Sequence, residues 1–562
     1  MKVDINTELI KNLELTIGAT RKKFNLKNIP VITLEPPPKK EFGDLSTNIA
    51  MQLYKLNRTS KPQTIASFIR EDLNNRISKG PLGEYIKDIS IKPPAFINFF
   101  FADKAFYEIL YQIQRQRANF GRTVIPGRGK KAIIEFVSAN PTGPLTVAHA
   151  RQAAVGSSIS NILKFFGWKV CQEYYLNDEG VQIDLLGSSI YARYAELAGF
   201  AFGFPEDGYK GDYIRDIAKE IYDKYGKKFK DYGDKEKRLF CEYGVKDILN
   251  TIKKDLSDMG VMFDNYTPQS ILTKSRKIKD AFRLLENKGL IYRKDDAVWF
   301  KSTKFYDDKD RVLIKSDGTY TYIAPDIAYH KNKYDRGFDW LIDIWGPDHH
   351  GYIGRMRAAQ RALGKEDKTL SILISQLVTI YRAGKLVRMS TRGGEFITLR
   401  EVLDEIGPDV AKFFFLMRKK ESHLDFDLEL AKSQSLDNPV YYIQYAHARI
   451  CGILEHSREK MKKIKNKADP RLLKQTEEMA ILRKLKEYPD ILLSAYNNLE
   501  PYRIIDYLLD LASSFHSFYA KHRVVTAKSL PLTQSRLLLV KCVKTIISNA
   551  LKLIGISQPE KM

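Results

Sequence analysis

A glutamate, an asparagine and a histidine lie within one short stretch of the chain, in an order that suits cation and phosphate binding. Residues 132–137 form an apolar run that contains Glu135, a loop with Asn140 follows, and His149 begins a segment rich in Ala, Ile and Leu. A strand, a turn and a helix in this order place backbone N–H groups at the helix N-terminus, where a phosphate is favoured. A carboxylate inside an apolar strand is costly unless it is paired, so Glu135 is a candidate cation ligand.

A second group of candidates lies in the segment 318–352. Asp326 follows Tyr322 by four residues at the start of a helical pattern, and Asp348 precedes two adjacent histidines. Glu135 and Asp326 are two carboxylates that together would suit a ligand with a cationic group. The adjacent histidines point in different directions and have no acidic third ligand at the right spacing, so we expect no zinc site.

A glycine-bounded cationic loop follows at residues 383–394, with Lys385, Arg388 and Arg392. Glycines at both ends allow positive φ and movement, which suits a loop that closes on a triphosphate.

These motifs carry a family resemblance. Residues 135–145 resemble, position by position, the frame E-F-x-S-x-N-P-T-G-P-L of arginyl-tRNA synthetases, which are class I aminoacyl-tRNA synthetases. The first class I signature, His-Ile-Gly-His, reads Thr146-Val147-Ala148-His149, so threonine replaces the first histidine and alanine the glycine. The loop at 388–392 resembles the second signature, Lys-Met-Ser-Lys, as Arg-Met-Ser-Thr-Arg, without either lysine.

The resemblance implies a role for each candidate. The implied catalytic residues are His149, Thr146, Lys385, Arg388, Ser390 and Arg392. The implied arginine-binding residues are Glu135, Asn140, Tyr322, Asp326 and Asp348. The implied ATP-binding residues are Pro141, Gly143, His149 and Met389. The implied tRNA-binding residues are Phe96, Asn98, Tyr442, Tyr445 and Met562.

Aromatic residues in the tRNA set also have ordinary explanations. Phe96 and Asn98 occupy a strand pattern, and from the residues alone a core strand explains them better than base stacking and amide readout. The family's N-terminal domain reads the tRNA D-loop, which shifts the interpretation towards RNA. For Tyr442 and Tyr445, stacking on anticodon bases and helix packing explain the spacing equally well.

The elements that must position these residues predict three parts. We expect a small α/β domain over 1–125, with a strand at 30–34 and a helix at 45–56, that recognises the D-loop. A Rossmann-like, doubly wound parallel sheet is expected over 126–430, with an insertion at about 186–300. An all-helical anticodon-binding domain is expected over 431–562.

Composition narrows the class of protein. The 562 residues predict two to four domains, and the formal net charge of +24 favours a polyanionic partner, although a generally basic proteome would also explain it. Four scattered cysteines and the absence of a long apolar run fit a cytoplasmic protein without disulfides or a membrane span. The resemblance adds ATP with Mg²⁺, no structural metal, and a monomer that binds L-arginine and tRNA-Arg but neither DNA nor a membrane.

The expected activity is ATP-dependent formation of arginyl-adenylate and transfer of arginine to the 3′ end of tRNA-Arg, with release of AMP and pyrophosphate. The resemblance also implies that activation needs bound tRNA. The altered signatures leave open a catalytically inactive tRNA-binding paralogue. A small-molecule nucleotidyltransferase would not need the basic excess or the helical C-terminal part, and a synthetase for a neutral amino acid would not need both Glu135 and Asp326.

Overall fold

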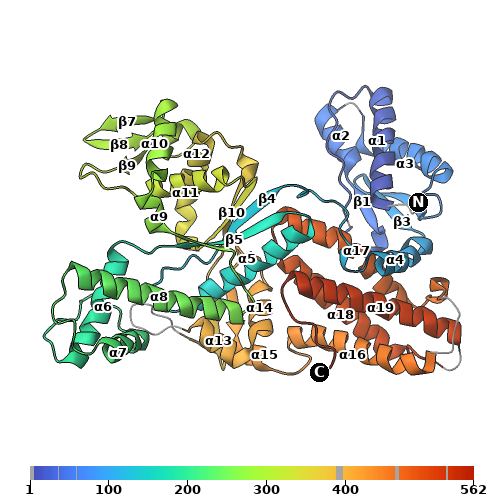
Figure 1. Ribbon diagram of the computed structural model, residues 1–562. Helices are drawn as coiled ribbons and strands as arrows, with labels where there is room; N and C mark the ends of the chain where they lie inside the picture. The colour runs from blue at the N-terminus through green and yellow to red at the C-terminus, as the bar shows by residue number, and fades with distance from the viewer. Residues whose placement is uncertain (1–4, 36, 59, 388–396, 462–467, 527–528) are drawn as a thin grey trace. The chain divides into compact units, whose positions relative to one another are not determined.

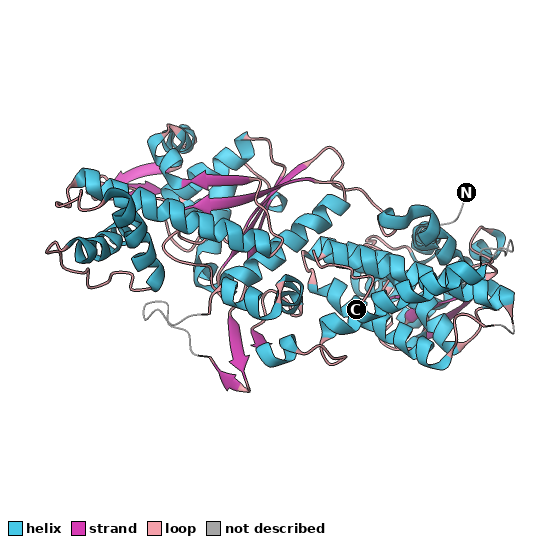
Figure 2. Cartoon of the chain, turned by 60° about the horizontal axis from the view of Figure 1, so that its bottom comes forward, coloured by secondary structure: helices cyan, strands magenta, loops and turns pink. Residues whose placement is uncertain are grey.

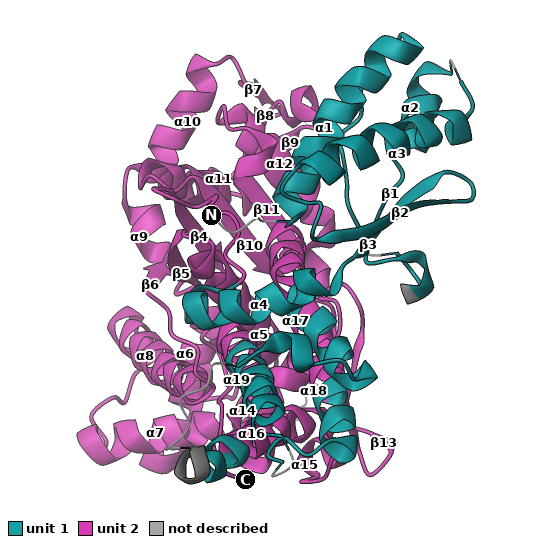
Figure 3. Ribbon diagram, turned by 90° about the vertical axis from the view of Figure 1, so that its right-hand side faces the viewer, with its two compact units in different colours: residues 1–120, 452–487, 513–546 teal, residues 121–451, 488–512, 547–562 magenta. Residues whose placement is uncertain are grey.

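The computed structural model describes residues 5–35, 37–58, 60–387, 397–461, 468–526 and 529–562. The chain forms two compact units (Figures 1 and 3). Unit 1 comprises residues 1–120, 452–487 and 513–546, and unit 2 comprises residues 121–451, 488–512 and 547–562.

The centre of unit 2 is a five-stranded, wholly parallel sheet with strand order β11-β10-β4-β5-β6. Its strands are β4 (Lys131–Glu135), β5 (Lys169–Leu176), β6 (Asn265–Pro268), β10 (Trp340–Trp345) and β11 (Leu370–Ile374). Helices cover both faces, so the inner strands are nearly continuous apolar runs, as the sequence 132–137 predicts. The doubly wound α/β prediction is confirmed, with β6 of this sheet lying inside the segment expected as an insertion.

Two helices on opposite faces of the sheet position the candidate residues. Helix α5 (Val147–Phe165) follows β4 and packs on β4, β5 and β10. Most of its residues are buried, since its Ala, Gly and Ser residues allow close packing. Helix α11 (Ile323–Asp335) packs with α10 and α12 over a core that includes Ile133 and Leu341 on the other face. Since side chains alternate along a strand, Glu135 shares the α11 face with Ile133.

Residues 121–451 also contain further helices and two small sheets (Figure 2). The helices are α6 (Val181–Ala198), α7 (Asp212–Tyr225), α8 (Asp234–Asp258), α9 (Gln269–Lys274), α10 (Lys277–Asn287), α12 (Ile353–Ala362), α13 (Leu399–Ile406), α14 (Pro408–Leu416) and α15 (Leu428–Lys432). The strands are β7 (Ile291–Lys294), β8 (Ala297–Phe300) and β9 (Arg311–Ile314) in one sheet, and β12 (Val378–Arg382), β13 (Lys385–Leu386) and β14 (Leu424–Asp427) in the other.

The N-terminal part of unit 1 is the expected small α/β fold. Its antiparallel sheet has the order β1-β3-β2, from β1 (Leu45–Thr47), β2 (Ile86–Lys92) and β3 (Phe96–Phe101). Its helices are α1 (Ile5–Phe24), α2 (Ile49–Asn57), α3 (Pro62–Lys79) and α4 (Asp103–Gln116).

Two local predictions in this part are wrong. Residues 30–34 form no strand, and the following residue makes only an isolated bridge, Glu35 to Ser46. The apolar run 45–56 begins with β1 rather than a helix, because Leu45 and Thr47 pair with β3 before α2 starts at Ile49. Tertiary pairing overrides helical spacing here.

Four long helices follow residue 431, as expected for a helical C-terminal part. They are α16 (Pro439–Met461), α17 (Thr476–Asn498), α18 (Tyr502–Lys521) and α19 (Leu530–Leu553). Within the described ranges, no strand lies beyond β14.

Candidate active site

Three carboxylates lie in one row across the parallel sheet. The register pairs Asp343 of β10 with Glu135 of β4, and Glu135 with Glu173 of β5. All three side chains are buried and share the sheet face that packs against α11. Buried carboxylates side by side repel one another, so this row requires cations from the covering helix.

Helix α11 supplies those cations from residues one turn apart. Lys333 Nζ donates to Glu135 Oε2 at 2.5 Å and to Asp343 Oδ1 at 2.9 Å. His330 Nε2 lies 2.8 Å from Asp343 Oδ2. These contacts bridge the first two carboxylates, so the Lys333 ammonium is shared between β4 and β10.

The third carboxylate, Glu173, has its own set of donors. Arg336 makes a bidentate pair with it, at 2.6 and 2.8 Å, and the Tyr329 hydroxyl donates to Oε1 at 2.6 Å. Asn265 of β6 donates to Oε2 at 2.6 Å. Glu173 is therefore fully engaged within the fold, which suits a structural role.

Electrostatics separate the three carboxylates. Burial raises the pKa of Glu135, and Lys333 opposes that rise. Burial would also raise the pKa of Asp343, but Lys333 and His330 bring it well below its usual value. Against the same burial, Arg336, Lys333 and Tyr329 lower the pKa of Glu173. Glu135 is thus the carboxylate of the row whose ionised form is stabilised least by its neighbours.

Asp326 lies in the first turn of α11. The Tyr352 hydroxyl donates to its Oδ2 at 2.6 Å, and burial raises the pKa of the Asp326 carboxyl. Tyr322 precedes the helix, and its side chain is 84% exposed. The structure therefore places Asp326 and Glu135 on the elements that face each other, and leaves the Tyr322 ring in solvent.

His149 is held at the start of α5 by the N-terminal cap. The backbone N–H of Thr146 donates to His149 Nδ1 at 3.2 Å, and the Thr146 hydroxyl lies 3.2 Å from the same nitrogen. Because Nδ1 accepts, the proton of the neutral ring sits on Nε2. Burial lowers the pKa of His149 to about 4, so the ring is a neutral N–H donor at physiological pH.

The loop between β4 and α5 is strained and cross-linked. Val137 and Ser138 have φ of 67° and 40°, which is unusual for residues with side chains. The Ser138 hydroxyl donates to Glu135 Oε1 at 3.3 Å and accepts the Tyr175 N–H at 3.0 Å. Asn140 Nδ2 donates to Gln182 Oε1 at 2.6 Å.

Two of the four residues expected to bind ATP, Pro141 and Gly143, lie in the same loop. Pro141 is buried, and a Cβ on Gly143 would meet the Tyr213 hydroxyl at 3.1 Å. That hydroxyl donates to the carbonyl oxygen of Thr142 at 2.7 Å, which holds the loop close to α7.

The other predicted residues of unit 2 are more scattered. Lys385 begins β13 and is exposed, whereas Arg388, Met389, Ser390 and Arg392 lie outside the described residues. Asp348 is exposed and forms an ion pair with His349 at 3.3 Å. Among the described residues, neither Lys385 nor Asp348 forms a hydrogen bond or ion pair with Glu135 or Asp326.

A buried arginine on α5 links the two signature regions and was missed by sequence reasoning. Arg151 donates from Nη1 to the carbonyl oxygens of Gln376 (2.9 Å), Leu377 (3.3 Å) and Ser422 (2.9 Å), and from Nη2 to that of Lys419 (2.9 Å). These carbonyls precede β12 and β14, so Arg151 ties the helix of His149 to the base of the hairpin that leads to the second signature.

The residues around Glu135 were also missed. Asp343 and Glu173 interrupt apolar strand patterns as Glu135 does, and that signal was available in the sequence. His330, Lys333 and Arg336 look like an ordinary polar helix face until the sheet is placed beneath them.

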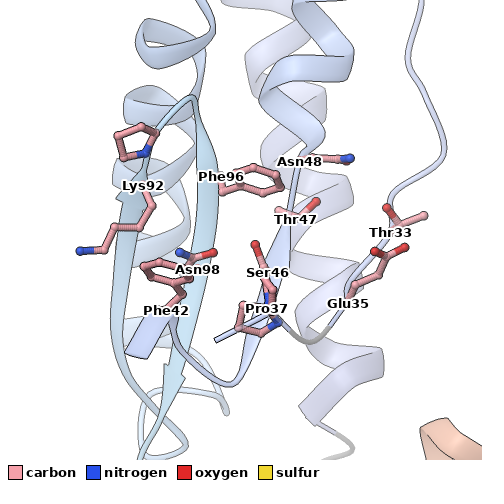
Figure 4. Close-up of a pocket in the computed structure, with 12 residues that line it drawn as sticks. Thr33, Glu35, Pro37, Phe42, Ser46, Thr47, Asn48, Lys92, Phe96 and Asn98 are labelled. Carbon is pink, nitrogen blue, oxygen red and sulfur yellow. The ribbon is translucent and has the colours of Figure 1, made fainter. Parts of the chain in front are cut away.

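In unit 1, Phe96 and Asn98 of β3 border a cavity of about 280 Å³ (Figure 4). Phe42, Ser46 and Lys92 also line it. Asn98 is 2% exposed, and its Oδ1 has no hydrogen-bond partner among the described residues. A buried acceptor without a partner beside an aromatic ring is suited to a planar ligand that carries an N–H group.

The three C-terminal candidates are separate from this cavity in the sequence. Tyr445 on α16 stacks on Tyr441 at 6.2 Å between ring centroids and accepts a hydrogen bond from Arg449. Tyr442 lies on the same helix and is half-buried, and Met562 is 49% exposed.

Metal clusters and membrane-spanning helices are both absent from the described part of the chain. Across that part, no cluster of three or more His, Cys, Asp or Glu side chains is arranged to hold a metal ion. None of the described helices has the length and apolar character needed to cross a membrane.

Comparisons with known proteins cover almost the whole chain. Residues 7–101 match the arginyl tRNA synthetase N terminal domain, residues 112–424 the class I (R) tRNA synthetase catalytic domain, and residues 443–562 the DALR anticodon binding domain. The arginine–tRNA ligase of Geobacter sp. strain M21 is 46% identical over 95% of both chains. That of Bacillus subtilis strain 168 is 42% identical over 100% of this chain and 99% of its own.

Solved structures agree on the fold. The arginyl-tRNA synthetase of Thermus thermophilus has a TM-score of 0.76 at 22% identity, covering 98% of this chain and 100% of that one. The enzyme of Plasmodium falciparum has a TM-score of 0.72 at 17% identity, covering 99% of each. With the family models and the full-length relatives, these findings show that the chain belongs to the arginyl-tRNA synthetase family of class I aminoacyl-tRNA synthetases.

Proposed function

We propose that this member of the arginine–tRNA ligases activates L-arginine with ATP and transfers it to tRNA-Arg at the carboxyl edge of β4. The observation that carries the proposal is the buried carboxylate row, which one loop joins to the helix bearing His149. Buried carboxylates next to a helix N-terminus suit a substrate with a cationic side chain and a phosphate-bearing co-substrate.

The arginine side chain is assigned to Glu135 and Asp326. Glu135 Oε1 has spare acceptor capacity beyond the 3.3 Å contact with Ser138, and Asp326 is anchored by Tyr352 at one oxygen. Two carboxylates can divide the five donors of a guanidinium between them, which a lysine ammonium could not satisfy equally. Tyr322 and Asp348, which are both exposed, are assigned to the rim of the arginine site.

The α-amino end of arginine is assigned to Asn140. Its Nδ2 is committed to Gln182, so Oδ1 is the atom left to accept from an ammonium.

ATP is assigned to the start of α5 and the loop before it. Adenylate formation needs the carboxylate and the α-phosphorus in line, and it needs donors for the charge that spreads over the phosphate oxygens. His149 Nε2–H and the Thr146 hydroxyl supply neutral donors there, with Pro141 and Gly143 shaping the loop. Lys385, Arg388 and Arg392 are proposed as cations and Met389 and Ser390 as loop contacts. Mg²⁺ enters with the ATP phosphates.

The tRNA is assigned to both terminal parts of the chain. The cavity at Phe96 and Asn98 is proposed to bind a base of the D-loop. The base would stack on the Phe96 ring while its N–H group donates to Asn98 Oδ1. Tyr442, Tyr445 and Met562 are proposed to contact the anticodon region. The proposal also assigns the D-loop, catalytic and anticodon roles to 1–125, 126–430 and 431–562, in a cytoplasmic monomer.

The test is ATP–pyrophosphate exchange with arginine, with and without tRNA-Arg, and with lysine and glutamate as controls. Exchange that requires arginine and tRNA together is the expected result. Asp326→Asn should raise the KM for arginine and leave that for ATP unchanged, whereas Asn98→Ala should raise the KM for tRNA alone. Tight tRNA binding without exchange for any amino acid would identify a catalytically inactive tRNA-binding protein and refute the proposal.

A further inference from the structure

Lys333 is a completely buried cation whose ammonium lies between two carboxylates of different character. It has 0% exposure, and its Nζ contacts Glu135 Oε2 at 2.5 Å and Asp343 Oδ1 at 2.9 Å. The ammonium also lies 4.3 Å from the centroid of the Tyr329 ring. A lysine is rarely buried to this extent unless its charge is needed there.

The two carboxylates differ in what remains available to a ligand. Asp343 is closed, because Lys333 holds one oxygen and His330 the other at 2.8 Å. Glu135 is half open, because its Oε1 has the 3.3 Å contact with the Ser138 hydroxyl while Lys333 holds Oε2. Lys333 therefore fixes the rotamer of Glu135 through Oε2 and leaves Oε1 available to another donor.

Glu135 would not keep its charge unaided in this position. The titratable groups around it come from each element packed against it: Asp343 from β10, Glu173 and Tyr175 from β5, and Asp326, Tyr329, His330 and Lys333 from α11. Three of these are carboxylates, and Glu173 already neutralises Arg336. Burial and the Asp343 charge both raise the pKa of Glu135, and Lys333 is the nearest group that lowers it.

We propose that Lys333 is a positioning residue for the ligase reaction, which keeps Glu135 ionised and oriented so that its Oε1 can receive the guanidinium of arginine. The inference rests on the proposed role of Glu135 in binding arginine. A protonated Glu135 would offer a neutral acid to the guanidinium and lose the ionic contribution to substrate binding. Without the ammonium, the buried acid behaves like other unpaired buried glutamates, whose pKa reaches about 8–9.

The size of the effect follows from that titration. At pH 7, a glutamate with a pKa of about 8–9 is ionised in roughly one to ten molecules per hundred. Lys333→Met should therefore raise the KM for arginine roughly tenfold to hundredfold at pH 7. The ratio of mutant to wild-type KM should fall about tenfold for each pH unit until the pKa is reached. A purely structural loss would change the KM without this pH dependence.

The experiment measures ATP–pyrophosphate exchange with saturating tRNA-Arg at pH 6.5, 7.5 and 8.5 for wild type, Lys333→Met and the matched control Lys331→Met. Lys331 lies on the same helix but pairs with Asp335 at the surface. Lys333→Gln, which keeps two N–H donors but carries no charge, is the second variant if the methionine protein does not fold. The Lys333 substitutions are also made and assayed in the Glu135→Gln protein, in which residue 135 cannot ionise.

The expected result is a KM ratio for arginine that shrinks as the pH rises, an unchanged KM for ATP, and no further penalty from Lys333→Met in the Glu135→Gln protein. A ratio that is constant with pH, or a full penalty in the Glu135→Gln background, would overturn the inference. Lack of exchange by wild-type protein with arginine would instead refute the proposed function, and it would be seen without any Lys333 variant.

Discussion

Replacement of Arg151 by methionine should loosen the base of the second-signature hairpin. The guanidinium donates to four backbone carbonyl oxygens that precede β12 and β14, three of them at 2.9 Å and one at 3.3 Å. Methionine fills much of the volume of the arginine stem, so the loss is chiefly one of hydrogen bonds. Burial lowers the pKa of Arg151 to about 10, which still leaves it charged at pH 7.

The magnitude follows from the carbonyls that lose their donor. Three good bonds at about 1–2 kcal/mol for each orphaned acceptor give a loss of about 3–6 kcal/mol. The long bond to Leu377 shares Nη1 with two shorter ones and adds little. Arg151→Lys keeps a charge and three donors on a shorter reach, so it should recover part of the loss.

Local stability is the quantity to measure, because a chain of 562 residues need not unfold in one step. Amide hydrogen exchange in β12 and β14 should be accelerated about a hundredfold or more in Arg151→Met, since each 1.4 kcal/mol is a factor of ten. The control Lys164→Met changes an exposed residue of the same helix. Exchange within threefold of wild type in both strands would show that the four bonds do not hold these strands, and the reasoning would be refuted.

Three other predictions concern the helix start, the sheet and the helix packing. His149 should contribute no inflection to the pH–rate profile between pH 5 and 8, because its pKa of about 4 keeps it neutral. His149→Ala should lower kcat roughly a hundredfold. An inflection near pH 6.5 that disappears in this variant would contradict the assignment. Tyr329→Phe should lower the stability of the protein by about 1.5–3 kcal/mol, because it removes the 2.6 Å hydrogen bond to the Glu173 carboxylate, and the loss should appear as a lower Tm. An unchanged Tm would show that Arg336 and Asn265 alone are enough to stabilise the buried carboxylate. Gly156→Ala should destabilise the protein by about 1–3 kcal/mol, since the new Cβ would lie 2.3 Å from the Phe136 ring. Gly18→Ala has open space around it and should stabilise the protein by up to about 1 kcal/mol. Equal Tm shifts for the two variants would refute the steric argument.

The sequence was most informative where local pattern and long-range structure agree. The apolar run ending at Glu135, the loop and the helix beginning after Thr146 appear in the fold at the expected positions. A charged residue in a strand that is buried on both faces was a sound signal of a polar site, because such a residue needs partners. The assignments of individual residues to arginine, ATP and tRNA remain predictions.

The partners of Glu135 could not be read from the sequence, since they depend on which strands become neighbours. Lys333 and Glu135 are 198 positions apart, and Arg151 and Ser422 are 271 apart. Lys333 and His330 lie in a helix with a mixed polar pattern that is typical of a solvent-facing surface. Only the placement of α11 over β10, β4 and β5 gives them their charge partners.

The carboxylate row also constrains how the chain can fold. Successive side chains of a strand point to opposite faces, so a shift of β4 by one residue would move Glu135 from the α11 face to the face packed by α5. There the carboxylate would lose its ammonium partner Lys333, at a cost of several kcal/mol. Asp343 and Glu173 impose the same penalty on their own strands. The carboxylates of this row thus disfavour a shifted strand register more strongly than apolar residues such as Ile133 and Ile134 do, because both faces of the sheet accept an apolar side chain.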